Sequence, residues 1–128
     1  MALNFFQRRK ILKKLNYMEA TPIRKSEHET AENGIVTIVV PKFKNQKLNN
    51  FLFLPRRRYF RISLDELGSE VWLQINGKIK VTEICHNVSE IFGDRISPVE
   101  QRVTKFLTTL YEARYISFVE IEEEMYKG

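Results

Sequence analysis

The sequence predicts an α+β fold, in which a three-stranded antiparallel sheet is followed by a three-helix bundle in a winged-helix-like arrangement. An extra basic helix is expected at the N-terminus. Three observations lead to this class. An Asn33-Gly34 turn precedes the β-branched run 35–40, as in a hairpin. Residues 59–64 alternate like a strand, and three apolar stripes of helical period follow them.

Length and composition indicate one cytoplasmic domain. The chain has 128 residues, of which 43% are hydrophobic, and no apolar run approaches the roughly 18 residues that span a bilayer. The basic N-terminus lacks the apolar segment of a signal peptide. A single cysteine excludes an intrachain disulfide and is typical of a reducing compartment. We expect a basic amphipathic helix over 1–16, one domain over 17–121 and a frayed acidic tail over 122–128.

The charges are divided unevenly along the chain. Residues 1–64 carry 14 Lys and Arg against 4 Asp and Glu, whereas residues 65–128 carry 7 against 12. Such a basic half can attract an acidic partner, nucleic acid or a membrane surface, or simply the acidic half. Asn4 to Leu15 reads as a basic amphipathic helix. Its apolar stripe is expected to dock on the domain or on a second copy, as a homodimer, with an anionic membrane as the alternative.

The strands are expected in the first half of the chain. Residues 17–30 lack a helical period and are expected to be extended, and they lead into the Asn33-Gly34 hairpin. Residues 42–58 form a basic, Asn-rich connection before the third strand, residues 59–64. Alternation places one set of this strand's side chains on the apolar side, namely Phe60, Ile62 and Leu64. The opposite set is Tyr59, Arg61 and Ser63.

Two of the helices are marked by their ends and stripes. Either Ser63 or Asp65 caps the first helix, and Asn76-Gly77 ends it. Its stripe is Leu67, Val71, Trp72 and Ile75, and Gly68 is expected to let another element approach closely. The second helix runs from about Val81 to Phe92 with the stripe Val81, Ile84, Cys85, Val88, Ile91 and Phe92. Lys80 stands at its cap position, where Ser or Thr would serve better.

The third helix opens with the Ser97-Pro98-Val99-Glu100 pattern of a capping box and ends near Ala113. Its expected stripe is Val99, Val103, Phe106, Leu107 and Leu110. Residues 116–121 are apolar and β-rich, as in a final strand.

No pattern of catalytic or metal-binding residues is evident. Cys85 and His86 are neighbours, but adjacent helical side chains point about 100° apart and do not face each other. The only other histidine is His28, which leaves too few ligands for a structural zinc site. The acidic run from Glu120 to Glu124 reads as a solvated terminal segment. We therefore expect a binding module that is not an enzyme.

One ordered set of residues, LDxxGxxVWxxINGxxxVxEI from Leu64 to Ile84, resembles the PqqD family, the small proteins named for pyrroloquinoline quinone synthesis. Matching positions continue at Phe92, Gly93, Val103, Phe106, Leu107 and Leu110, so that the resemblance covers roughly residues 58–117. It implies a module without a cofactor that binds a ribosomally made precursor (leader) peptide. Its partner would be a modifying enzyme, often a radical S-adenosylmethionine protein.

Two kinds of ligand suit such a fold. In the reading that follows the resemblance, a peptide pairs with the edge of the third strand and lies against the third helix, as in β-augmentation. The residues expected at this site are Tyr59, Arg61, Ile62, Ser63, Arg102, Phe106 and Thr109. Arg61 and Arg102 are expected to meet acidic peptide residues. The alternatives are a nucleic-acid reader, which the charges of the third helix disfavour, and another protein–protein adaptor.

Overall fold

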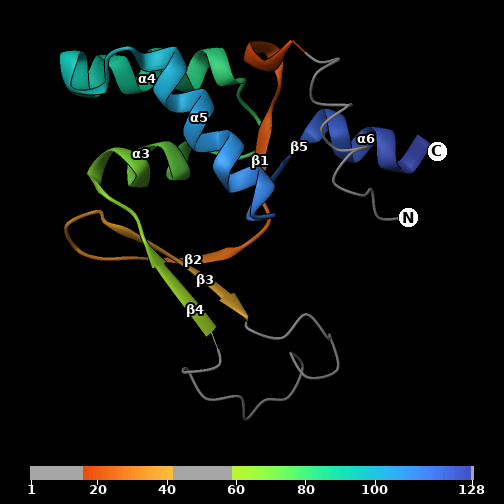
Figure 1. The fold of residues 1–128 in the computed structure, drawn as a ribbon, viewed down its shortest axis with the longest axis horizontal. Coiled ribbons are helices and arrows are strands. Elements are labelled where there is room, and N and C mark those ends of the chain that lie inside the picture. Colours follow the sequence, from red (N-terminus) through yellow and green to blue (C-terminus); the bar gives the residue numbers. More distant parts are fainter. Residues whose placement is uncertain (1–15, 42–58, 128) are drawn as a thin grey trace.

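The computed structural model describes residues 16–41 and 59–127, with side chains as far as residue 124. The expected N-terminal helix, apart from Asn16, and the connection 42–58 lie outside these residues. The elements in chain order are η1 (Tyr17–Glu19), β1 (Pro22–Arg24), β2 (Glu27–Thr30), β3 (Val36–Pro41), β4 (Tyr59–Ser63), α3 (Glu66–Gln74), α4 (Val81–Phe92), η3 (Gly93–Ile96), α5 (Val99–Glu112), β5 (Ile116–Phe118) and α6 (Val119–Lys127). The fold is α+β. The helices α3, α4 and α5 stack on one side of the sheet formed by β2, β3 and β4 (Figure 1).

The three-stranded sheet is antiparallel, with β3 between β2 and β4. The predicted hairpin around Asn33-Gly34 is confirmed: the Gly34 N–H donates to the Ala31 carbonyl at 2.9 Å, and the Ile35 N–H donates to Asn33 Oδ1 at 3.1 Å. Gly34 has a φ of +87°, which glycine adopts without steric cost. The turn residues thus fix the register in which β2 meets β3.

A second, two-stranded sheet joins the two ends of the described chain, and the sequence analysis did not predict it. Strand β1 pairs antiparallel with β5, with Ile23 opposite Ser117. The final strand is shorter than expected, because the chain turns into α6 at Val119. The Val119 N–H donates to the Thr21 carbonyl at 2.8 Å, so the start of α6 is tied to the residues before β1.

The expectation of a frayed acidic tail is wrong, since α6 extends through Lys127. Acidic side chains near its start bond to the first part of the chain. The Glu120 carboxylate accepts hydrogen bonds from Thr21 N at 2.7 Å and Thr21 Oγ1 at 2.9 Å, and Lys25 Nζ lies 2.8 Å from Glu122 Oε1. Carboxylates also suit the first turn of a helix, where unpaired N–H groups make the end positive. Ile121 of α6 is buried in the hydrophobic core.

The helix caps agree with the sequence analysis at two ends and differ at one. Of the two residues considered for the start of α3, Asp65 is the cap, and its Oδ1 accepts from the Gly68 N–H at 2.7 Å. Lys80 makes no side-chain cap bond at α4, as expected. The capping box at Ser97 is not formed: the Ser97 N–H closes η3 by donating to the Asp94 carbonyl at 3.1 Å, and α5 begins only at Val99.

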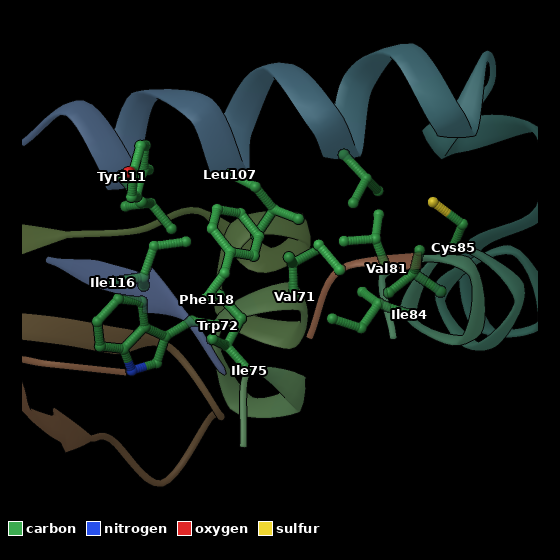
Figure 2. Close-up of a cluster of buried hydrophobic side chains, with 14 of the residues drawn as sticks. Val71, Trp72, Ile75, Val81, Ile84, Cys85, Leu107, Tyr111, Ile116 and Phe118 are labelled. Atoms are coloured by element: carbon green, nitrogen blue, oxygen red, sulfur yellow. The ribbon is translucent and has the colours of Figure 1, made fainter. Parts of the chain in front are cut away.

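The core gathers apolar side chains from helices and strands, and Trp72 is one of its largest members (Figure 2). The Trp72 ring is fully buried and meets His28 of β2 edge-to-face, with 6.0 Å between ring centroids. Most stripe residues lie in the core as predicted. Ile91 does not: it is 56% exposed, because it lies in the last turn of α4 at the margin of the stripe. Tyr111 and Phe118, which the sequence analysis did not assign to the core, are buried and in contact at 5.4 Å between ring centroids.

Candidate functional site

The strand β4 forms one edge of the three-stranded sheet. Within the described residues it pairs with β3 and with no strand on its other side. The Leu64 N–H donates to the Val36 carbonyl at 2.9 Å. Ile62, two residues before Leu64 in β4, lies opposite Ile38 of β3. In an antiparallel pair, residues that exchange bonds with the neighbouring strand alternate with residues whose N–H and C=O point the other way. The register therefore identifies the backbone groups at the open edge.

Two sets of residues alternate along β4. The set whose backbone groups face β3 is Phe60, Ile62 and Leu64. The set whose N–H and C=O groups face the open edge is Tyr59, Arg61 and Ser63. These are also the residues that the alternation predicted to turn their side chains away from the apolar side. An incoming extended chain could thus pair with three residues whose side chains are not needed in the core.

The inner row of β4 is covered only in part. Ile62 is half-buried and packs against the core, as its alternation predicts. Phe60 was expected on the same apolar side but is 56% exposed. It stands at the start of β4, which is the end of the strand farther from the helices (Figure 1). The side chains on the apolar side of β4 are therefore better buried near α3 than at the start of the strand.

The charge at the centre of the edge belongs to Arg61, which forms an ion pair with Glu29 of β2 on the outer face of the sheet. The two side chains are 38% and 50% exposed. An ion pair this open to water contributes on the order of 0–1 kcal/mol. Arg61 therefore remains able to exchange its partner for another carboxylate.

Arg102, Phe106 and Thr109 follow one another at i, i+4 and i+7 along α5, a spacing that places them on one side of the helix. The Arg102 Nη1 donates to the Arg95 carbonyl at 2.5 Å, and Thr109 Oγ1 donates to the Lys105 carbonyl of its own helix at 3.0 Å. Phe106 is half-buried and packs toward the core. Only Arg102 and Phe106 of these three line the pocket described next.

An open pocket of about 110 Å³ lies between the start of α3 and α5. It is lined by one acidic, one basic and several apolar residues together with a glycine: Asp65, Leu67, Gly68, Val71, Ile96, Arg102, Val103 and Phe106. Gly68 makes this approach possible, since a Cβ built on it would lie 3.3 Å from Phe106 Cζ and 3.0 Å from Asp65 Oδ1. The prediction that Gly68 admits another element closely is confirmed, and that element is the Phe106 ring.

The pocket adjoins the carboxyl end of β4, because its α3 residues begin directly after Leu64 and Asp65. The edge and the α5 residues were named from the sequence, but the α3 part of the lining was not. Leu67 was assigned to the core stripe, and it is half-buried at the pocket instead. The absent side chain of Gly68 in a helix was the signal that could have located the pocket.

The structure separates the two residues that most resemble a catalytic pair. Cys85 is buried, and burial raises the pKa of its thiol to about 11. The side chain of His86 is 72% exposed, and its Nε2 lies 3.9 Å from Glu90 Oε1. A protonated, buried thiol is a weak nucleophile. Among the residues with described side chains, no group of three or more His, Cys, Asp or Glu is placed to hold a metal ion.

The comparison with protein families matches residues 52–116 to the model of Coenzyme PQQ synthesis protein D (PqqD). The chain belongs to the PqqD family. The match spans β4, α3, α4 and α5, which carry the open edge and the pocket, whereas β2 and β3 of this PqqD chain lie before it. Searches of curated proteins and of solved structures found no match. No helix in the described part of the PqqD chain is both long and apolar enough to span a bilayer.

Proposed function

We propose that this PqqD-family protein is a non-catalytic peptide-binding module. It takes an extended precursor peptide as a further strand at the β4 edge and presents it to a modifying enzyme. The observation that carries the proposal is the outward set of backbone groups on Tyr59, Arg61 and Ser63. Each N–H and C=O that pairs with a peptide contributes a backbone hydrogen bond, and alternate peptide side chains reach neighbouring surfaces.

The pocket between α3 and α5 supplies a place for one such side chain. It lies at the end of β4 at which the peptide strand would pass the helices, and Phe106 and Val71 give it apolar walls. The Arg102 guanidinium lies at the same lining, where its Nη1 donates to the Arg95 carbonyl and its other N–H groups can meet a ligand. A peptide carboxylate beside an apolar residue would satisfy both features. Thr109 continues the same stripe of α5 beyond the pocket.

The arrangement of the helices and the sheet supports this placement. We take residues 17–121 as one winged-helix-like module, in which α4 and α5 stand in helix-turn-helix relation and β2, β3 and β4 form the sheet. The helix α6 continues the module, because Ile121 is buried and Glu120 bonds to Thr21. Such modules present either a helix or a sheet edge to their ligands.

The family description connects PqqD with the synthesis of coenzyme PQQ. We extend this to the chain as a proposal: its partners are a ribosomally made precursor peptide and the enzyme that modifies it, such as a radical S-adenosylmethionine protein. The module itself needs no cofactor for this role, because binding and presentation involve no bond-making step. A cytoplasmic location follows from the same proposal.

A nucleic-acid reader is the less favoured function. The exposed side of α5 carries Gln101, Arg102 and Lys105, but Glu100 and Glu112 accompany them. A recognition helix needs basic and amide side chains free to meet base edges and phosphates.

The test is a titration of isotope-labelled protein with a candidate precursor peptide encoded beside its gene, followed by backbone amide shifts. Saturable shifts at Tyr59, Arg61, Ser63 and along α5 are expected. A parallel titration with duplex DNA serves as the comparison. Tight, salt-dependent binding to DNA with no response to the peptide would contradict the proposal.

A further inference from the structure

The residue at the centre of the open edge is a fixed positive charge. Arg61 lies midway between Tyr59 and Ser63, and its side chain lies on the outer face, opposite to the face that α3 covers. An edge strand with unpaired backbone groups can accept any extended chain, including the same strand of a second copy. The side chains at the edge must therefore decide which strand is accepted.

Pairing with a second copy has one register that uses the whole edge. In a two-fold symmetric, antiparallel arrangement, the same residues of both copies face each other in reverse order. The outward set then pairs Tyr59 with Ser63 of the second copy and Arg61 with its own equivalent. A shift by two residues removes one of these three pairings. Like charges directly opposite each other in a sheet are destabilising, so the fullest register places two guanidinium groups against each other.

We propose that Arg61 selects the occupant of the β4 edge: an extended peptide with a carboxylate opposite Arg61 is accepted, and a second copy of this chain is disfavoured. The inference rests on the proposed function and specifies the chemistry of its ligand. The β3–β4 ladder fixes the backbone register, and charge complementarity at that register favours the carboxylate.

The existing contact of Arg61 is consistent with this chemistry. Its Nη2 already meets a carboxylate, that of Glu29, across β3 on the outer face. A guanidinium carries five N–H donors in a planar fork, so a contact through Nη2 leaves donors for a second carboxylate. Because both side chains of the pair are substantially exposed, reorientation toward a peptide costs little.

The test uses two peptides drawn from the chain itself. One copies residues 58–64, and the other is identical except that glutamate replaces its central arginine. In the antiparallel register, this central residue lies opposite Arg61. At low salt, we expect the glutamate peptide to bind the full-length protein about fivefold or more tightly than the copy, from the difference between opposite-charge and like-charge cross-strand pairs. Amide shifts at Tyr59 and Ser63 locate the site.

The variant Arg61→Glu should reverse the order of the two peptides, and Arg61→Gln should bring them close to equal affinity. Lys78→Glu, an exposed lysine in the turn between α3 and α4, makes the same change in net charge and should keep the wild-type order. Circular dichroism checks that each variant folds.

Equal binding of the two peptides to the wild-type protein, or binding of neither, would overturn the inference. So would a reversal of the order by Lys78→Glu, because the preference would then reflect net charge. Equal, saturable shifts on β4 leave the proposed function standing and overturn only the role of Arg61. If the precursor peptide causes no amide shifts on β4 while the two test peptides bind in the expected order, the result would instead count against the proposed function.

Discussion

Proline substitutions at two neighbouring residues of β4 separate edge pairing from sheet stability. The Ile62 N–H faces β3, opposite Ile38, whereas the Ser63 N–H faces the open edge. Proline removes the backbone N–H, and it is tolerated on an edge strand where that N–H faces away from the sheet. Ser63→Pro should therefore affect the ligand, and Ile62→Pro should affect the fold.

The magnitudes follow from the hydrogen bonds that each substitution removes. Ile62→Pro loses one ladder bond, about 1 kcal/mol, and leaves a carbonyl of β3 unpaired at about 1–3 kcal/mol, so the free energy of unfolding should fall by roughly 2–4 kcal/mol. Ser63→Pro loses no bond to β3, and its free energy of unfolding should stay within about 1 kcal/mol of wild type. Its peptide affinity should fall about tenfold, because one intermolecular bond is lost and the peptide carbonyl stays unpaired.

Chemical denaturation gives the free energy of unfolding of both variants, and anisotropy of a labelled precursor peptide gives the affinity of Ser63→Pro. Wild-type protein and the exposed-site variant Lys78→Glu serve as controls. If Ser63→Pro destabilises the fold as strongly as Ile62→Pro, the assignment of backbone groups to the open edge is wrong. If Ser63→Pro retains full peptide affinity, the peptide does not pair at this residue.

Three further predictions concern the scaffold. Because burial raises the pKa of the Cys85 thiol to about 11, a disulfide reagent at pH 8 should leave the native protein unmodified and label it on unfolding; rapid native labelling would refute the burial. Burial lowers the pKa of His28, so the folded state favours the neutral ring. The free energy of unfolding should be fully retained above about pH 6.5 and fall below it, and its dependence on pH should be weaker in His28→Gln. The same pH dependence in wild type and His28→Gln would contradict this. Gly77 has a φ of +76°, and a Cβ there would lie 3.0 Å from Ile23 Cδ1, whereas Gly34, at +87°, has open space around it. Chemical denaturation should show that Gly34→Ala lowers the free energy of unfolding by roughly 1–2 kcal/mol and that Gly77→Ala lowers it by more. Equal losses would count against the Ile23 contact.

The helices and the hairpin were predictable because their signals are local. The stripe of α4 repeats with the helical period over twelve residues, and its ends were placed at Val81 and Phe92, where the structure has them. The Asn33-Gly34 turn needs only four residues to specify a reversal of the chain. Signals of this kind depend on neighbours in sequence.

The features that were missed depend on distant contacts. The strands β1 and β5 have three residues each, too few to show alternation, and they are brought together by the packing of both chain ends. The capping pattern at Ser97 was overridden because the Ser97 N–H closes η3. A local motif yields when the preceding element supplies another partner.

The strand edge of the candidate site could be predicted from the sequence, but its pocket could not. Alternation placed Tyr59, Arg61 and Ser63 on the outward side of β4, and the sheet order makes β4 an edge. The pocket required knowing that α5 crosses the start of α3 at Gly68, which no periodicity contains. The register also directs the Ile62 N–H toward β3, so Ile62 holds β4 in the sheet and does not offer its N–H to a peptide.

The most direct test of the account is residue-resolved amide hydrogen exchange on β4, with and without saturating precursor peptide. The account predicts an alternating response: the amides of Tyr59, Arg61 and Ser63 become protected on binding, while that of Ile62 is already slow in the free protein. Protection confined to β2, or no change at the three outward amides when the peptide is bound, would contradict strand addition at β4.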